Sequence, residues 1–523
     1  MSHSESIVFA IAVVILVVAL SAFARRLPVP TPILQLVAGF VVALIPGIAV
    51  PELDPELVFF VFLPPVIWSA AMFTSVRDFR RNIGPITTLA VGLVVATTIV
   101  IAIVAHRLFP GLPWAAAIAL GAIVSPPDAV AATAIVSRLP VPRRVVTILE
   151  GESLVNDASA LTLYRAAVAA AVTGAFSWGE SLVRFFIDAG VGSFIGLVVA
   201  WLIIRAAHST KDSLAEALLT LAGPYVAWLA AEQLHVSPVL ACVAGGVYLN
   251  QRLSTAVSPT SRIQTRTIWD LATFLLNALI FLLLGAQIGM LFGLLPGASR
   301  GVVLRNGGLI TLVAIAVRIL WVPFFTVCRR ASPEIRAREP KVRWRALFLV
   351  SWTSMRGVVT LATALALPRT TASGAAFPYR TEIILIAMCV IVLTLFAQGL
   401  SLTTIVRALR FEPEDGHLAE ERLARREATR RGAEALEDVS HEDWVDRRDV
   451  DALRAEVRER AAMAEEHGGS FEGRRRLRLT MISAERRMLI RLRNEDAISD
   501  DVLRALEQEL DLEAIRAGAG DDR

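Results

Sequence analysis

Long runs of apolar residues, separated by short polar segments, dominate the chain up to about residue 409. Most runs are about 18 residues or longer, which is the length a helix needs to cross the hydrocarbon core of a bilayer, and the run 236–250 is shorter. We therefore predict an all-α, polytopic membrane helical bundle of about 13 transmembrane helices over residues 1–409. The predicted spans are 6–24, 31–49, 56–73, 83–108, 114–138, 145–173, 182–206, 213–233, 236–250, 268–294, 303–328, 345–367 and 381–406.

The pattern changes at about residue 410, and residues 410–523 are rich in Glu, Arg, Ala and Leu. Apolar runs are short here, and pairs such as Glu421 and Arg425 have the spacing that supports a solvated helix. We predict a cytoplasmic helical tail, either as a solvated extension or with a regulatory or dimer-contacting role. One amphipathic stripe of the tail contains Met481, Ala484, Met488 and Leu492.

Composition and charge agree with a membrane protein and suggest its orientation. The chain has 523 residues, 55% of them hydrophobic, and a formal net charge of +4. Arginines gather in alternate loops, which predicts that those loops are cytoplasmic, that the N-terminus lies outside and that the tail lies inside the cell. The three cysteines and seven histidines form no metal or disulfide pattern. We expect no cofactor, no enzymatic activity and no nucleic-acid partner.

The first candidate for chemistry is the segment Ser125-Pro126-Pro127-Asp128, in the middle of the fifth predicted span. Two prolines remove backbone donors and interrupt the helix, so that freed carbonyls and helix ends can face a cavity beside an acid. Transporters build ion sites in this way at the middle of the membrane. A proline kink in which Asp128 only caps the second half-helix is the alternative.

The second candidate is the segment Glu150–Asp157 in the sixth predicted span. Helical spacing places Glu150, Ser153 and Asp157 on one face, with Glu152 and Asn156 on a neighbouring stripe. The oxygens of Asp157, Ser153 and Asn156 suit a hard cation, and a desolvated carboxylate can also hold a proton. One acid that binds either a proton or a cation is sufficient for exchange. A buried polar network that only orders the bundle remains the alternative.

Two arginines, Arg318 and Arg356, lie inside predicted spans, and each requires an acidic or carbonyl partner in hydrocarbon. Glu150 and Glu152 are the candidate partners, and a structural role is favoured for both arginines. Gly357 interrupts the twelfth span as the two prolines interrupt the fifth. These interruptions fall at corresponding positions of spans 1–6 and 8–13, which suggests inverted repeats with discontinuous helices.

With these motifs the chain resembles the monovalent cation:proton antiporters of the first type, which include bacterial and animal Na⁺/H⁺ exchangers. The resemblance extends over about residues 5–408. It is carried by Leu63-Pro64-Pro65, Ser125–Asp128, Gly151–Asp157, the Phe274, Asn277, Phe281 and Gly285 pattern, and Arg356-Gly357.

The resemblance implies that Asp157 is the essential ion- and proton-binding carboxylate, completed or supported by Asn156, Ser153 and Asp128. It implies that Glu152 pairs with Arg318, with Arg356 and Ser125 as further supporting residues. It also implies 13 helices, a homodimer in membrane lipid and an elevator-like core. Asn156, where the electrogenic branch has an acid, implies electroneutral exchange, and the absence of lysine from every predicted span agrees.

The chain departs from the family pattern at two positions. Ser69 stands where the family often has an acid after Leu-Pro-Pro, and Ala129 stands where a proline often follows Asp128. Both departures concern the ligand set, and they leave Na⁺, K⁺ and Li⁺ open as the transported cation, including a K⁺/H⁺ antiporter.

Other functional classes fit the sequence less well. An intramembrane aspartyl protease would need Tyr-Asp and Gly-x-Gly-Asp elements, and neither precedes Asp128 or Asp157. A sensor would need a signalling motif in the tail, and a channel would gain nothing from proton competition at a broken helix.

Overall fold

The computed structural model describes most of the chain as helices. The described residues are 15–24, 29–45, 56, 58–136, 139–174, 178–210, 212–256, 258–294, 297–338, 343–411, 415–442, 445–465, 469–495, 497 and 499–516. Within them the only β pairing is an isolated bridge between Thr370 and Ala376. The chain divides into two compact units, Met1–Glu412 and Pro413–Arg523.

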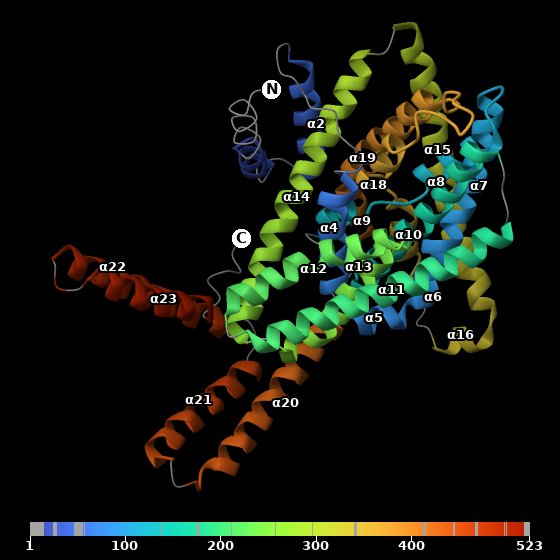
Figure 1. Cartoon of the computed structure of the whole chain (residues 1–523). Coiled ribbons are helices and arrows are strands. Elements are labelled where there is room, and N and C mark those ends of the chain that lie inside the picture. The colour runs from blue at the N-terminus through green and yellow to red at the C-terminus, as the bar shows by residue number, and fades with distance from the viewer. Residues whose placement is uncertain are drawn as a thin grey trace. The chain divides into compact units, whose positions relative to one another are not determined.

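The helices of the first unit follow the predicted spans closely (Figure 1). Up to the middle of the unit they are α2 (Thr31–Leu44), the π-helical η1 (Val58–Phe62), α4 (Leu63–Phe73), α5 (Val76–Arg81), α6 (Ile83–Thr87), the π-helical η2 (Thr88–Leu93), α7 (Val94–Leu108), α8 (Trp114–Val124), α9 (Ala129–Val136), α10 (Arg143–Thr173) and α11 (Trp178–Ser209). The rest are α12 (Ser213–Gln233), α13 (Pro238–Ala256), α14 (Pro259–Leu294), α15 (Gly297–Ala331), α16 (Pro333–Arg338), α17 (Trp344–Trp352), α18 (Val358–Leu365) and α19 (Arg380–Leu409).

Six helices among the described residues are long and apolar enough to cross a membrane. They are Ile83–Leu108, Phe186–Ser209, Ser213–Gln233, Thr260–Leu291, Gly301–Ala331 and Arg380–Leu409. The other predicted spans coincide with α10, which carries the Glu150–Asp157 segment, or with shorter or interrupted helices. The first predicted span, 6–24, lies partly outside the described residues. The chain is thus a polytopic helical membrane protein.

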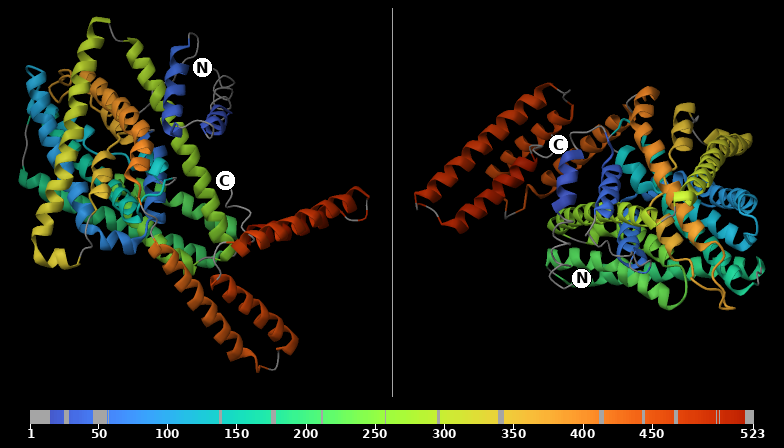
Figure 2. Two further views of the ribbon diagram at one scale, coloured as in Figure 1. Left: turned by 180° about the vertical axis from the view of Figure 1, so that it is seen from behind. Right: turned by 90° about the horizontal axis from the view of Figure 1, so that it is seen from above.

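The helices of the first unit form two groups by their packing. The panel group consists of α2, α4 and α11–α14, where α2 packs on α14 and α13 packs on α4, α11 and α12. The core group consists of α7–α10, η2, α15 and α17–α19, where α15 packs on α7, α17 and α19, and α8 packs on α7 and α10. Figure 2 shows α15 and α19 side by side from behind.

Close approach of backbones holds the panel group together. A Cβ atom at Gly285 of α14 would overlap the carbonyl oxygen of Leu36 in α2, so only glycine permits this crossing. Small residues at helix crossings are the usual means of packing in membranes, where helices gain little from burying apolar side chains away from lipid.

The tail unit consists of two helical hairpins. The first pairs α20 (Asp415–Val439) with α21 (Arg447–Glu465), and the second pairs α22 (Gly469–Asn494) with α23 (Asp500–Arg516) (Figures 1 and 2). The guanidinium of Arg454 donates to both carboxylate oxygens of Glu437, at 2.7 and 2.6 Å. This hydrogen bond lowers the pKa of the Glu437 carboxyl below its usual value.

Candidate functional site

Two helices of the core group are interrupted where the sequence predicted breaks. The fifth span stops at Val124 and resumes at Ala129, and the twelfth stops at Trp352 and resumes at Val358. Pro126 and Pro127 supply no N–H groups to continue the first of these helices. The two breaks meet: a Cβ atom at Gly357 would collide with the carboxylate of Asp128, so a larger residue here would displace that side chain.

Backbone groups at the two breaks bond to each other and to side chains of α19. The N–H of Asp128 donates to the carbonyl of Met355 at 2.7 Å, which joins the two interrupted helices directly. The N–H of Ser354 donates to Oε1 of Gln398 at 3.2 Å, and the N–H of Arg356 donates to Oγ1 of Thr394 at 3.1 Å. Backbone groups at membrane depth must find such partners, so the crossing is a satisfied structure rather than a defect.

Arg356 is 2% exposed and bonds to carbonyls of both breaks. Its Nε donates to the carbonyl of Val124 at 2.9 Å, at the end of α8, where the helix dipole favours a cation. Its Nη1 donates to the carbonyl and hydroxyl oxygens of Ser354. The sequence predicted either an acidic or a carbonyl partner for Arg356, and in the structure its guanidinium donates to carbonyls.

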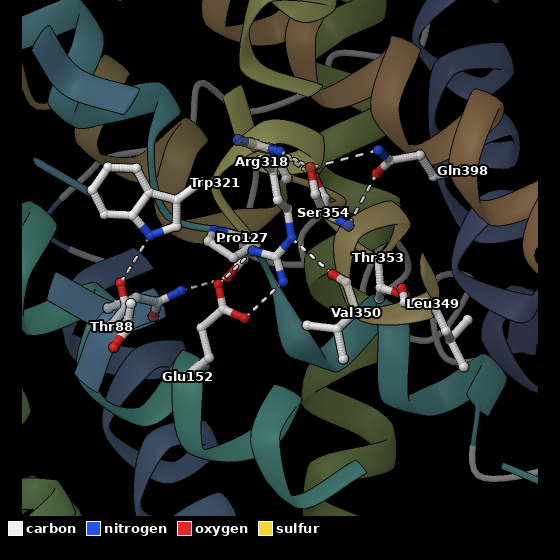
Figure 3. A network of polar contacts seen from close by, with 12 residues as sticks. Thr88, Pro127, Glu152, Arg318, Trp321, Leu349, Val350, Thr353, Ser354 and Gln398 are labelled. Carbon is white, nitrogen blue, oxygen red and sulfur yellow. Dashed lines mark hydrogen bonds and ion pairs between the residues drawn. The ribbon is translucent and has the colours of Figure 1, made fainter. Parts of the chain in front are cut away.

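Arg318 and Glu152 form a buried, bidentate ion pair (Figure 3). Arg318 is 1% exposed and Glu152 is 1% exposed. Nη2 of Arg318 donates to Oε2 of Glu152 at 2.7 Å, Nη1 donates to Oε1, and Nε donates to the carbonyl of Val350 at 3.0 Å. This is the pairing that the family resemblance implies. It neutralises the charge of Glu152 and fixes α10 against α15 and α17.

A cavity of about 630 Å³ lies between the panel and core groups and reaches the crossing. Its walls combine apolar side chains with carboxylate, hydroxyl and amide oxygens. The core group contributes Asp128, Glu150, Ser153 and Asp157, and the panel group contributes Ser69, Thr74, Asp270 and Asn277. Asp157 is only 8% exposed, so a cation bound there would lose most of its water. The predicted helical face of Glu150, Ser153 and Asp157 is the one that lines this cavity.

The structure decides between the two placements that the sequence suggested for Glu150. The sequence left it open as a partner of a buried arginine, but it lines the cavity with Asp157, and Glu152 takes the arginine. The distinction comes from the helix stripe, because Glu150 and Glu152 are about 200° apart around α10.

Three further predicted site residues, Asn156, Ser125 and Ser69, donate hydrogen bonds to backbone carbonyls near the cavity's acids. Nδ2 of Asn156 donates to the carbonyl of Pro127 at 2.9 Å, which ties α10 to the first break, while its Oδ1 is buried without a partner in the described structure. Ser125 is buried and donates to the carbonyl of Ala122 at 3.1 Å. Ser69 lines the cavity, and its hydroxyl donates to the carbonyl of Val66 at 3.0 Å.

Charged residues stand at one end of the cavity. Arg266 and Asp270 of α14 line it, with 3.7 Å between Nε and Oδ2, and the guanidinium lies over the ring of Phe73 at 5.0 Å. A smaller cavity of about 410 Å³ lies near the other end of α10, where Leu161, Tyr164, Trp228 and Glu232 line it. Both cavities lie along α10, on either side of the level of Asp157.

Sequence reasoning missed Gln398 and Thr394, which bond to the backbone of the second break. Both are fully buried in α19. Polar side chains inside the apolar run 381–406 were the available signal, because such groups in a membrane helix need a partner.

A polytopic bundle whose interrupted helices cross beside buried carboxylates has the architecture of a secondary transporter. The chain belongs to the sodium/hydrogen exchanger family, whose transmembrane pattern matches residues 12–408.

Individual relatives support this assignment. The uncharacterized Na(+)/H(+) exchanger Rv2287 of Mycobacterium tuberculosis is 34% identical over 98% of this chain and 97% of its own length. The sodium, potassium, lithium and rubidium/H(+) antiporter of Bacillus pumilus is 34% identical over 90% of this chain and 72% of its own length. The sodium proton antiporter MjNhaP1 from Methanocaldococcus jannaschii has a similar fold, with a TM-score of 0.60 at 19% identity, over 79% of this chain and 100% of that one.

Proposed function

We propose that this chain is a secondary active transporter that exchanges Na⁺, K⁺ or Li⁺ for H⁺, with cation and proton competing for Asp157. The arrangement of charges carries the proposal. Asp157, Asp128 and Ser153 share a cavity wall at the helix crossing, whereas the neighbouring Glu152 is neutralised by Arg318. Asp157 is thus the deeply placed acid on α10 whose charge is available for exchange.

The chemistry follows from the oxygens around Asp157. A hard monovalent cation needs oxygen ligands to replace lost water, and carboxylate and hydroxyl groups supply them at this wall. A proton on Asp157 removes the charge that holds the cation, so one species displaces the other. The neutral side chain of Asn156, engaged with the carbonyl of Pro127, leaves one exchangeable charge. We therefore propose one cation per proton and an electroneutral cycle.

Alternating access is supported by the two cavities along α10. The 630 Å³ cavity reaches Asp157 from one end, and the 410 Å³ cavity approaches from the end near Tyr164. A shift of the core group against the panel group would move Asp157 from the first cavity toward the second. The arginine-rich loops favour a cytoplasmic opening for the larger cavity, an external N-terminus and a cytoplasmic tail.

The cation and the assembly state are finer parts of the proposal. The name of the Bacillus pumilus relative includes potassium, so a K⁺/H⁺ antiporter for potassium and pH homeostasis is the second candidate. A homodimer in membrane lipid is also proposed. The panel helix α11 carries large exposed apolar side chains, among them Phe186, Phe194 and Trp201, which lipid or a second copy would cover.

Cation-driven proton movement in proteoliposomes tests the proposal. Na⁺ and K⁺ are added in turn while an ionophore clamps the membrane voltage. We expect one cation or both to move protons in the opposite direction, at a rate that does not change with voltage. A voltage-dependent rate would overturn the electroneutral cycle. If no added cation moves protons, exchange itself would be overturned.

A further inference from the structure

A second group of buried oxygens lies in the panel group, away from Asp157. Four side-chain oxygens there are buried and have no hydrogen-bond partner within the described structure. They are Oε2 of Glu216 in α12 and Oγ of Ser261, Oε1 of Gln264 and Oγ1 of Thr265 in α14. Glu216 is 7% exposed, and Ser261 and Thr265 are 0% and 2% exposed. None of these four residues lines the transport cavity.

The register of α12 and α14 places Glu216 and Thr265 at facing positions of the two helices. The two helices pack together, and Nε1 of Trp269 donates to Oγ1 of Thr220 at 3.1 Å. Glu216 lies one turn before Thr220, and Thr265 lies one turn before Trp269, so the two residues face each other if the helices run parallel.

The cavities show that the helices do run parallel. The start of α14, at Arg266, lines the same cavity as Glu150 near the start of α10. The end of α12, at Glu232, lines the cavity of Tyr164 near the end of α10. Both α12 and α14 therefore begin at the Glu150 end of the bundle. Ser261 extends the same face of α14 by one more turn, and Gln264 lies between them, directly before Thr265 and one turn after Ser261.

The hydroxyl of Thr265 behaves differently from its neighbours in α14. Thr267 donates to the carbonyl of Ile263 at 3.0 Å, and Thr273 donates to the carbonyl of Trp269 at 2.7 Å. Such back-bonding is the ordinary way for a helical threonine to satisfy its hydroxyl. Thr265 makes no such bond, although it is almost fully buried.

A carboxylate that is more than nine-tenths buried without a partner is too costly to leave uncompensated. Among the described residues no cationic side chain pairs with Glu216, and the nearby Arg266 is engaged with Asp270 and Phe73. A carboxylate, two hydroxyls and an amide carbonyl form an all-oxygen donor set, which hard cations prefer.

We propose that Glu216, Ser261, Gln264 and Thr265 form a second site for a monovalent metal cation, separate from the transport site. Its single carboxylate balances one positive charge. The site joins the cytoplasmic starts of α12 and α14, as the orientation proposed above places them. A cation held there locks these two panel helices together while the core group carries out exchange.

Thermal unfolding of the full chain in detergent tests the site. The Asp157→Asn variant is used as background so that the transport site does not contribute, and NaCl or KCl is compared with choline chloride at equal ionic strength. We expect Na⁺ or K⁺ to raise Tm by about 2 °C or more, because a ligand that binds only the folded state stabilises it. Adding Glu216→Gln should remove this rise.

Two further variants make the test specific. Thr265→Val should weaken the cation-dependent rise, whereas Thr267→Val, in which the lost hydroxyl is bonded within its own helix, should leave it intact. If Glu216→Gln does not fold, the two threonine variants carry the comparison. A rise that persists unchanged in Glu216→Gln or Thr265→Val would overturn the site. Equal Tm in Na⁺, K⁺ and choline would also overturn the site, and water or a proton would then satisfy the buried oxygens.

Discussion

The two helix groups of the membrane unit differ in the continuity of their helices, and therefore in the contacts that matter most in each. In the panel group, α14 crosses α2 with backbones in contact at Gly285. In the core group, the ion pair of Arg318 with Glu152 (Figure 3) and the bond from Arg356 to the carbonyl of Val124 connect the segments around the interrupted helices. The first kind of contact resists deformation, and the second compensates for interrupted helices.

The difference shows that the core group, which contains the site, gives up helical hydrogen bonds at its two interruptions. Interrupting two helices releases backbone groups that the core must satisfy from other elements, which Gln398, Thr394 and Arg356 do. The panel helices are continuous and need less of this, although the hydroxyl of Tyr225 donates to the carbonyl of Val61, which Pro65 cannot bond. We expect substitutions at the crossing to affect transport first, and substitutions at the glycine contacts to affect stability first.

The largest effect is expected at Asp157. Asp157→Asn keeps the size of the side chain and removes the charge that we propose is exchanged, so cation-driven proton movement should fall to the level of empty liposomes. The folded fraction on size-exclusion chromatography should be unchanged. As a matched control, Asp270→Asn removes an exposed acid at the end of the same cavity and should leave exchange measurable. Exchange by Asp157→Asn at the original rate would contradict the account.

The ion pair between Glu152 and Arg318 should have the next largest effect, on stability. Removing one partner leaves a buried charge unpaired, which costs about 3–5 kcal/mol of unfolding free energy. Glu152→Gln and Arg318→Met should each lower Tm strongly in detergent. The double variant Glu152→Leu with Arg318→Met should recover part of the loss, since neither charge remains buried. Equal destabilisation in all three variants would show that the pair is not the cause.

Two glycine substitutions separate the groups directly. Gly357→Ala pushes a methyl group into the carboxylate of Asp128, so exchange should drop with a modest change in Tm. Gly285→Ala drives α14 away from the carbonyl of Leu36, and overpacking of this kind costs about 1–3 kcal/mol. Its Tm should fall while the remaining folded protein still exchanges. The reverse pattern would erase the distinction between the two groups.

The smallest effect is expected in the tail. The lowered pKa of Glu437 means that its bond with Arg454 stabilises the hairpin at pH values above the usual carboxyl value of 4.5. This contribution is lost only as the pH falls through the lowered value. Hydrogen exchange of α20 and α21, corrected for intrinsic rates, should be constant between pH 7 and pH 5. A loss of protection within that window would contradict the role of the pair.

Much of the membrane unit could be predicted because one signal is strong there. Apolar runs of membrane length predicted most helices of the membrane unit, though not the short α5 and α16, and Pro126, Pro127 and Gly357 predicted both interruptions. The two π-helical segments, Val58–Phe62 and Thr88–Leu93, were not predicted, because an apolar run looks the same in either kind of helix.

The partners at the site were harder to predict than its residues. The sequence indicated that Arg356 needs an acid or a carbonyl, but the choice of Val124 depends on how two distant segments cross. The same applies to the bond from Asp128 to Met355. Glu216 escaped notice because it lies at the start of a helix, where an acid is ordinary, and only its packing against α14 makes it unusual.

Competition between cation and proton at Asp157 is the central claim, and the pH dependence of the apparent KM for the cation tests it most directly. Exchange would be measured in proteoliposomes over a series of pH values and cation concentrations, with the voltage clamped. If both species bind Asp157, KM should rise on the acidic side by up to about tenfold per pH unit, while the maximal rate at saturating cation stays constant. A KM that does not change with pH, with a maximal rate that falls instead, would contradict a shared site.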